Sequence, residues 1–198
     1  MATLAPFLQR LYYPAMALTE ASVCDFGWKA IDFDLAGVDG KRHTLASARG
    51  PNGLLVMFIC NHCPYVKAAI DRIVRDCTEL TARGIGSIAI MSNDPTDYPE
   101  DSFDNMVRVA RAKRFPFPYV LDETQQVAKA YRAQCTPDFF GFNGKLELQY
   151  RGRLDASGRQ PVPDARRELF EAMVGVAKTG RGPAEQTPSI GCSIKWKG

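Results

Sequence analysis

Two cysteines separated by two residues are the part of this sequence with the clearest chemistry. Cys60 and Cys63 lie between an apolar run, residues 53–58, and a long amphipathic pattern that starts at Pro64. Such a pair can close a small disulfide ring, and the positive end of a helix favours a thiolate. The pattern therefore predicts thiol–disulfide exchange, with Cys60 as the exposed attacking sulfur and Cys63 as the resolving thiol.

His62 stands between the two cysteines. An imidazolium at this place would favour the thiolate and make the disulfide more oxidising, because a nearby positive charge lowers a thiol pKa. The alternative is a histidine that is merely exposed on the first turn of the helix. We expect the functional role, in which His62 tunes the pair.

The elements that must position these residues alternate between strand and helix. Residues 31–35 alternate apolar and polar, and Asp39-Gly40 predicts a hairpin that returns over residues 42–45. Apolar residues spaced by three, four or seven predict a helix from Pro64 that stops near Gly84. The other expected elements are strands at 85–91 and 119–121, helices at 102–114, 123–131 and 165–178, and a hairpin of 139–142 and 145–150 with a type I′ turn at Asn143-Gly144.

This order predicts an α/β protein with the thioredoxin fold, a central mixed sheet flanked by helices. The fold needs a cis-proline loop that faces the disulfide just before the last hairpin, and Thr136-Pro137 stands there. We expect an N-terminal extension over residues 1–30, a redox domain over 31–178 that begins with a β-hairpin, and a tail over 179–198 that packs on the domain.

Composition limits the class of protein. The 198 residues are 45% apolar and 24% charged, with a net charge of +3, which argues for neither nucleic acid nor an acidic membrane surface. No apolar run approaches the ~20 residues that span a bilayer, and the N-terminus lacks the pattern of a secretory signal. We expect a cytoplasmic protein without a cofactor, in which the cysteine pair is catalytic rather than a structural disulfide.

Five stretches resemble a bacterial thioredoxin-like redoxin subgroup of the peroxiredoxin (AhpC/TSA) superfamily. They are residues 60–67, with the motif Cys-Asn-His-Cys-Pro, 92–94, 98–103, 135–140 and 188–192. The resemblance implies the thioredoxin fold and thiol chemistry more firmly than it implies a substrate. The expected partners are protein or small-molecule disulfides and thiols, with a cellular thiol as reductant.

Two residues depart from the pattern of thioredoxins. Ile59 stands where they have a tryptophan, and Leu54 occupies the place of the buried acid that accepts a proton. Another group must then assist proton transfer, with His62 as one candidate and Asp138 as a weaker one. We expect Thr136 and Pro137 to shape the substrate groove.

A thiol peroxidase with an antioxidant role is the alternative. Peroxiredoxins resemble Pro-x-x-x-Thr-x-x-Cys at the reactive cysteine, where the threonine and a distant arginine polarise the peroxide. Alignment on Cys60 puts Gly53 and Met57 at the Pro and Thr positions, and alignment on Cys63 puts Val56 and Cys60 there. Both alignments fail, although Arg151 or Arg153 could stand in for the arginine.

A copper or zinc site is a lesser alternative, because Cys60, His62 and Cys63 are soft ligands. The spacing does not match copper-delivery proteins of this fold, and the other histidine, His43, lies in the early hairpin. A tetrahedral zinc site would have to recruit Cys135 or Cys192. We therefore expect no metal.

The remaining cysteines are predicted separately. Cys77 lies on the apolar stripe of its helix and is expected to be a small core residue, whereas Cys24 allows no interpretation. Cys135 directly precedes the Thr136-Pro137 loop and is a candidate for an auxiliary redox role. Cys192 lies in the tail, either as a third redox cysteine or as an inert thiol under a docked segment.

Overall fold

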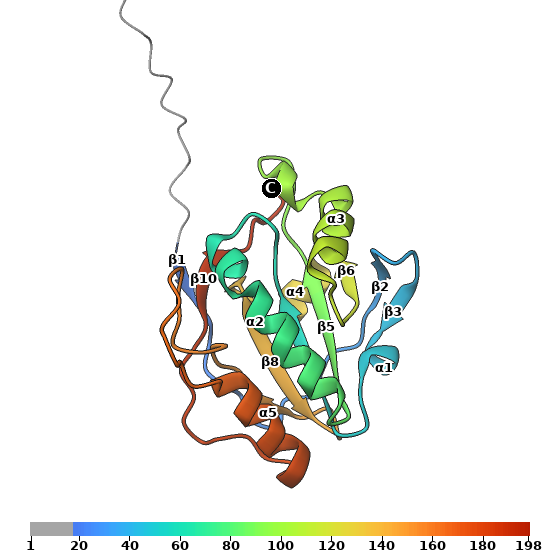
Figure 1. The fold of residues 1–198 in the computed structure, drawn as a ribbon. Helices are drawn as coiled ribbons and strands as arrows, with labels where there is room; N and C mark the ends of the chain where they lie inside the picture. Colours follow the sequence, from blue (N-terminus) through green and yellow to red (C-terminus); the bar gives the residue numbers. More distant parts are fainter. Residues whose placement is uncertain (1–17) are drawn as a thin grey trace, which may run out of the picture.

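The computed structural model describes residues 18–198, which form a mixed sheet with helices on both faces (Figure 1). Within this range no helix has the length and hydropathy needed to cross a bilayer. The strands are β1 (Leu18–Glu20), β2 (Asp34–Gly37), β3 (Arg42–Thr44), β4 (Gly53–Phe58), β5 (Ile85–Met91), β6 (Tyr119–Leu121), β7 (Cys135–Thr136), β8 (Asp138–Asn143), β9 (Leu148–Tyr150) and β10 (Ile190–Ser193). The helices are α1 (Leu45–Ala48), α2 (Pro64–Thr81), the short 3₁₀ helix η1 (Pro99–Asp101), α3 (Phe103–Lys113), α4 (Gln126–Tyr131) and α5 (Glu168–Thr179).

The central sheet is built around β4. This strand pairs antiparallel with β8, which pairs antiparallel with β9. On its other side β4 lies beside β5, and the Ile59 N–H just beyond β4 donates to Ile90 O over 3.1 Å. β5 is parallel to β6, and the hairpin of β2 and β3 continues the sheet antiparallel to β6. The central sheet is therefore mixed, as the sequence predicts.

Alternate side chains of β4 enter two separate cores. Leu55 and Met57 face the helices α2 and α5, whereas Leu54, Val56 and Phe58 face the opposite side with α1 and α4. All six residues of β4 are buried because both faces of the sheet are covered by helices. The strand thus holds the cysteine pair at its end on a rigid, fully packed support.

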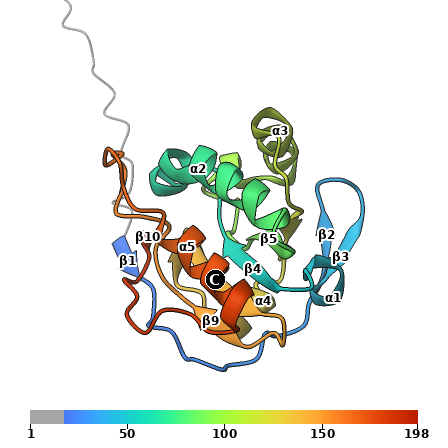
Figure 2. The ribbon, with the colours of Figure 1, turned by 60° about the horizontal axis from the view of Figure 1, so that its bottom comes forward.

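The tail forms a small second sheet at one edge of the molecule. β10 lies between β1 and β7, antiparallel to both, and Cys192 stands opposite Thr136 in the register. Figures 1 and 2 both show β1 and β10 at the edge away from the β2–β3 hairpin. The sequence predicts a docked tail but no strand in it. The expected boundaries of the extension and the tail stay a prediction, and residues 1–17 lie outside the described residues.

Two local features differ from what the sequence predicts. The short helix α1 is not expected; Thr44 and Ser47 cap it reciprocally, each side chain accepting from the backbone N–H of the other. Asn143 and Gly144 do not form a two-residue type I′ turn. The Asn143 side-chain oxygen instead accepts from the N–H groups of Lys145 and Glu147, which closes a longer loop before β9.

Candidate active site

The cysteine pair lies between β4 and α2. The helix begins at Pro64, which has no backbone N–H of its own to leave unpaired, and Cys63 is its N-cap residue. Cys60 and Cys63 are only 1% and 0% exposed. The expectation of an exposed Cys60 sulfur is therefore wrong, because neighbouring segments cover both sulfurs.

The loop of Thr136 and Pro137 is one of these segments. Its peptide bond is cis, as expected from its place before the last hairpin. Thr136 Oγ1 lies 3.2 Å from Cys60 Sγ, and Cys63 Sγ lies 3.1 Å from the Thr136 backbone oxygen. One residue of this loop thus contacts both sulfurs.

His62 is buried beside the pair and does not lie exposed on the helix. Its Nδ1 lies 2.5 Å from Asp101 Oδ2, and its ring stacks on Tyr98 with the centroids 4.3 Å apart. A ring nitrogen of His62, Cys60 Sγ and a carboxylate oxygen of Asp101 all lie within 4.8 Å of one another. His62 Nε2 has no hydrogen-bond partner among residues 18–198. The histidine is therefore held by a carboxylate, with a ring nitrogen within 4.8 Å of Cys60 Sγ.

Asp101 is the site residue that the sequence analysis missed. Its Oδ1 accepts from the N–H groups of Asn61 (2.7 Å) and His62 (3.1 Å), and its Oδ2 accepts from Asn93 Nδ2 (2.9 Å). Together with the contact to His62 Nδ1, these hydrogen bonds join residues 61–62, between the two cysteines, to η1. The bond from Asn93 joins η1 to the segment after β5. The one signal in the sequence was its place within residues 98–103, which take part in the family resemblance.

The tail brings a third sulfur to the pair. Cys192 Sγ on β10 lies 2.8 Å from Cys63 Sγ, and Cys192 is 2% exposed. Gly191 permits this approach, because a Cβ there would collide with the Thr136 backbone oxygen. Cys60, Cys63 and Cys192 thus surround Thr136.

A sequence model of the AhpC/TSA family matches residues 26–153, about two thirds of the chain. The chain belongs to the AhpC/TSA family. This confirms the family that the sequence resemblance indicates. No similarity to a curated protein reaches significance.

Solved structures match a larger part of the chain than the family model does. An uncharacterized conserved protein from Geobacillus kaustophilus is 43% identical, with a TM-score of 0.86 over 92% of this chain and 97% of that one. A hypothetical protein from Sinorhizobium meliloti 1021 is 34% identical, with a TM-score of 0.84 over 90% and 98%. A putative thioredoxin from Neisseria meningitidis is 18% identical, with a TM-score of 0.59 over 76% and 90%. The thioredoxin fold predicted for this AhpC/TSA protein is confirmed.

Neighbouring thiols shift the pKa values of the site cysteines in this family member. Hydrogen bonds from the Cys192 and Cys60 thiols hold the pKa of Cys63 well below its usual range. Burial, followed by the hydrogen bond to Cys63, raises the pKa of Cys60, and the Thr136 hydroxyl opposes this rise. Cys63 is thus the cysteine with the lowered pKa, while the helix position predicts a favoured thiolate at Cys60.

Arg151, Arg153 and Asp138, which the sequence suggests as site residues, form ion pairs away from the two cysteines. Arg151 lies 3.2 Å from Asp138, both buried, and Arg153 lies 2.7 Å from Glu168. Asp138 is thus the ion-pair partner of Arg151, whereas Asp101 is the carboxylate that lies beside Cys60. In the described part of the chain, neither arginine has a hydrogen bond to a sulfur of the pair.

The other cysteines lie outside the sulfur cluster. Cys135 Sγ faces the backbone oxygens of Pro137 (3.5 Å) and Ser189 (3.9 Å), and burial raises the pKa of Cys135. Cys77 packs in the core, where burial raises its pKa to about 12. Half-buried Cys24 has its pKa raised to about 11 by desolvation.

Cys60, His62 and Asp101 have the mutual spacing of metal ligands. The Asp101 carboxylate, however, already accepts two hydrogen bonds at each oxygen, which uses the lone pairs that a metal would need. A metal here would have to displace the bond that orients His62. The arrangement suits a histidine–carboxylate pair better than a metal site.

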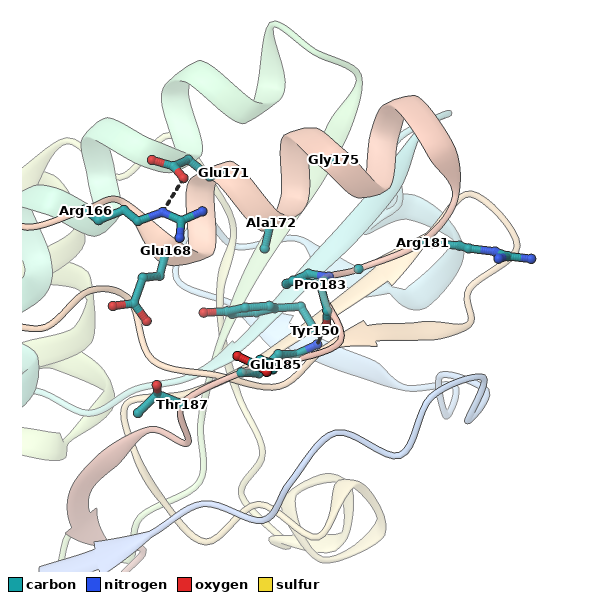
Figure 3. Close-up of a pocket in the computed structure, with 12 residues that line it drawn as sticks. Tyr150, Arg166, Glu168, Glu171, Ala172, Gly175, Arg181, Pro183, Glu185 and Thr187 are labelled. Carbon is teal, nitrogen blue, oxygen red and sulfur yellow. Dashed lines mark hydrogen bonds and ion pairs between the residues drawn. The ribbon is translucent and has the colours of Figure 1, made fainter.

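Two hollows differ in their relation to the cysteines. A groove of about 760 Å³ lies over α5 and the segment 181–187, with Tyr150 at its floor, and its charged side chains include the Arg166–Glu171 pair (Figure 3). None of its lining residues is a cysteine. A smaller cleft of about 300 Å³ between α2 and the end of α3 is lined by Cys60 and Asn61. Of these two hollows, the smaller cleft is therefore the one that reaches a cysteine of the pair.

Proposed function

We propose that this AhpC/TSA protein is a thiol–disulfide oxidoreductase that uses Cys60 and Cys63 as its dithiol. The observation that carries the proposal is the contact of both sulfurs with Thr136 beside Pro137. One residue thereby holds the two thiols and sets the geometry in which they exchange. The lowered pKa of Cys63, caused by hydrogen bonds from its neighbouring thiols, supports a thiolate within the pair.

Cys60 is the attacking sulfur in this proposal because it lines the smaller cleft, whereas Cys63 is enclosed by Thr136 and Cys192. Apolar side chains from α2 and the end of α3 form most of the cleft, with two lysines among them. The lining residues besides Cys60 and Asn61 are Ile59, Val66, Lys67, Ile70, Val109, Lys113 and Phe115. Such a cleft suits a disulfide in an apolar setting, from a polypeptide or a small thiol.

The reaction begins when Cys60 passes its proton to Cys63 through their hydrogen bond. The Cys60 thiolate attacks the substrate disulfide, which forms a mixed disulfide and releases one substrate thiolate. Cys63, once deprotonated again, attacks the Cys60 sulfur, forms the Cys60–Cys63 bond and releases the second thiolate. The substrate gains two electrons and the protein loses two. A cellular thiol of the cytoplasm would return them.

His62 and Asp101 assist proton movement in this proposal. A ring nitrogen of His62 lies within 4.8 Å of Cys60 Sγ, and Asp101 fixes the orientation of the ring. Its Nε2 has no hydrogen-bond partner in the part of the chain that the structure describes. An imidazolium at His62 favours the Cys60 thiolate. This pair takes the place of the buried acid that Leu54 replaces.

The test is reduction of a fluorogenic disulfide-bonded peptide by the reduced protein. Cys60→Ser and Cys63→Ser should each abolish turnover, and Cys63→Ser should accumulate a mixed disulfide at Cys60, because nothing at position 63 resolves it. Cys77→Ser is the matched control, since it removes a buried thiol from α2, the helix that follows the pair. Wild-type turnover by Cys60→Ser would overturn the proposal.

A thiol peroxidase is the second candidate, and the family match together with the acidic thiol at the start of α2 favours it. The peroxide would oxidise a cysteine to a sulfenate, which a second cysteine would then condense to a disulfide. Hydrogen peroxide in place of the peptide tests this. A sulfenate at Cys60 or Cys63 together with sustained peroxide consumption would favour the peroxidase.

A further inference from the structure

The third sulfur is placed to take part in the exchange. We propose that Cys192 is a catalytic cysteine that takes over Cys63 from Cys60, so that the oxidised protein passes from a Cys60–Cys63 to a Cys63–Cys192 disulfide. This deepens the proposed function and rests on it. The carrying observation is the 2.8 Å between Cys63 Sγ and Cys192 Sγ, both buried in one cluster.

The fold holds Cys192 in this place from two sides. β10 pairs with β7 on one edge and with β1 on the other, so Cys192 stands opposite Thr136 and Leu18 at once. The same Thr136 contacts Cys60 through its hydroxyl and Cys63 through its backbone oxygen. Cys63 is thus the sulfur with a thiol neighbour on each side, one from the bend before α2 and one from the tail.

Cys192 lies on a strand that is added to the edge of β7. An extended segment beside β7 presents a sulfur to Cys63, in the way an added strand presents side chains to a sheet edge. Here the segment belongs to the chain itself, so its thiol is delivered at a high effective concentration. Cys135, the neighbouring cysteine on β7, contacts backbone oxygens and has no sulfur contact within residues 18–198.

The step balances without a further reactant. After Cys60 and Cys63 have formed their disulfide, the Cys192 thiolate attacks the Cys63 sulfur. The Cys63–Cys192 bond forms, the Cys60–Cys63 bond breaks, and its electron pair leaves on Cys60 as a thiolate. The proton that Cys192 gives up balances the new charge on Cys60, so the step is an isomerisation with no net change in oxidation state.

The charges around Cys192 favour this order of events. In the reduced site the hydrogen bond to Cys63, followed by burial, raises the pKa of Cys192. The cause related to Cys63 disappears once Cys63 is in a disulfide, while the nearby positive charge of Lys195 still lowers the pKa of Cys192. Cys192 therefore becomes a better nucleophile once the Cys60–Cys63 disulfide has formed. Cys60 is then free again at the cleft, and the disulfide is held beneath the tail.

Disulfide mapping of the full-length protein tests the proposal. The reduced protein is oxidised with diamide, free thiols are alkylated, and tryptic peptides are analysed by mass spectrometry. Cys60 and Cys63 share the peptide 50–67, whereas Cys192 lies in 182–195, so the two disulfides differ as a bond within one peptide and a link between two. The Cys60→Ser variant removes the remaining ambiguity, because a link in it must come from Cys63.

The expected result is a link between the peptides in wild type, in Cys60→Ser and in the control Cys77→Ser. Cys192→Ser and Cys192→Ala should show only the bond within 50–67. A Cys60→Ser protein in which Cys63 and Cys192 both stay reduced would overturn this proposal and leave the proposed function intact. A wild-type protein that never forms the bond within 50–67, at any oxidation time, would overturn the proposed function instead.

Discussion

His62 Nδ1 and Asp101 Oδ2 lie 2.5 Å apart, and both side chains are at least nine-tenths buried. The carboxylate also accepts the backbone N–H groups of Asn61 and His62, so one residue fixes both the ring and the bend that carries Cys60. Burial without a partner would be costly for either charge. The pair therefore explains how a histidine can sit inside the site beside a sulfur.

Asp101→Asn tests this pairing. A neutral amide leaves His62 without its anion and turns an NH₂ group toward hydrogen-bond donors. We expect the free energy of unfolding to fall by about 3–5 kcal/mol, measured by urea denaturation of the reduced protein. Asp71→Asn is the control, since Asp71 is exposed and its pair with Lys113 contributes about 1 kcal/mol or less. An equal loss in both variants would contradict a special role for Asp101.

The acidity of Cys63 predicts how the reduced protein responds to pH. The folded pKa of Cys63 is lowered below that of an unfolded thiol, about 8.5, so between the two values the unfolded chain binds a proton that the folded chain does not. Stability from this group therefore rises with pH toward about 8.5 and is lost as pH falls through the folded pKa. Urea denaturation between about pH 5 and about pH 8 should show a steeper rise in wild type than in Cys63→Ser. Parallel slopes would argue against a lowered pKa at Cys63.

Cys192→Ser should weaken that acidity, because the Cys192 thiol is the foremost cause that lowers the pKa of Cys63. Far-ultraviolet absorbance reports thiolate without requiring access to a buried sulfur. We expect the thiolate signal of the variant to appear at higher pH than that of wild type, with Cys77→Ser unchanged. A hydroxyl can still donate, so Cys192→Ala should show the larger shift. No shift in the alanine variant would contradict the contact.

The sequence predicts the fold and the cysteine pair because both depend on local patterns. Three patterns can be recognised in the sequence alone: the apolar run 53–58, the apolar helical spacing after Pro64, and the place of Thr136-Pro137 before the last hairpin. Asp101 and Cys192 differ, since their roles arise only from long-range packing. Asp101 meets His62 from 39 positions away, and Cys192 meets Cys63 from 129 positions away. The burial of Cys60 escaped prediction for the same reason, because distant segments cover it.

The ion pair of Arg151 and Asp138 gives a prediction for the fold beneath the site. Both side chains are buried 3.2 Å apart, and burial raises the pKa of Asp138 against the lowering effect of Arg151. Arg151→Met leaves the carboxylate unpaired and should reduce the free energy of unfolding by about 3–5 kcal/mol. Adding Asp138→Asn should recover part of the loss, because it removes the orphaned charge. Arg42→Met, in an exposed pair with Asp34, is the control, and a loss there of the same size would contradict the argument.

Gly191 sets how closely the tail approaches the site. A Cβ at this position would collide with the Thr136 backbone oxygen, so Gly191→Ala must push β10 away from β7 and carry Cys192 from Cys63. We expect a lower free energy of unfolding and loss of the link between peptides 50–67 and 182–195 after oxidation. Gly175→Ala is the matched control: it lies within α5 with open space around its Cβ, and it should stabilise by about 0.5–1 kcal/mol. A Gly191→Ala protein that forms the link as wild type does would show that close pairing of β10 with β7 is not what brings the two sulfurs together.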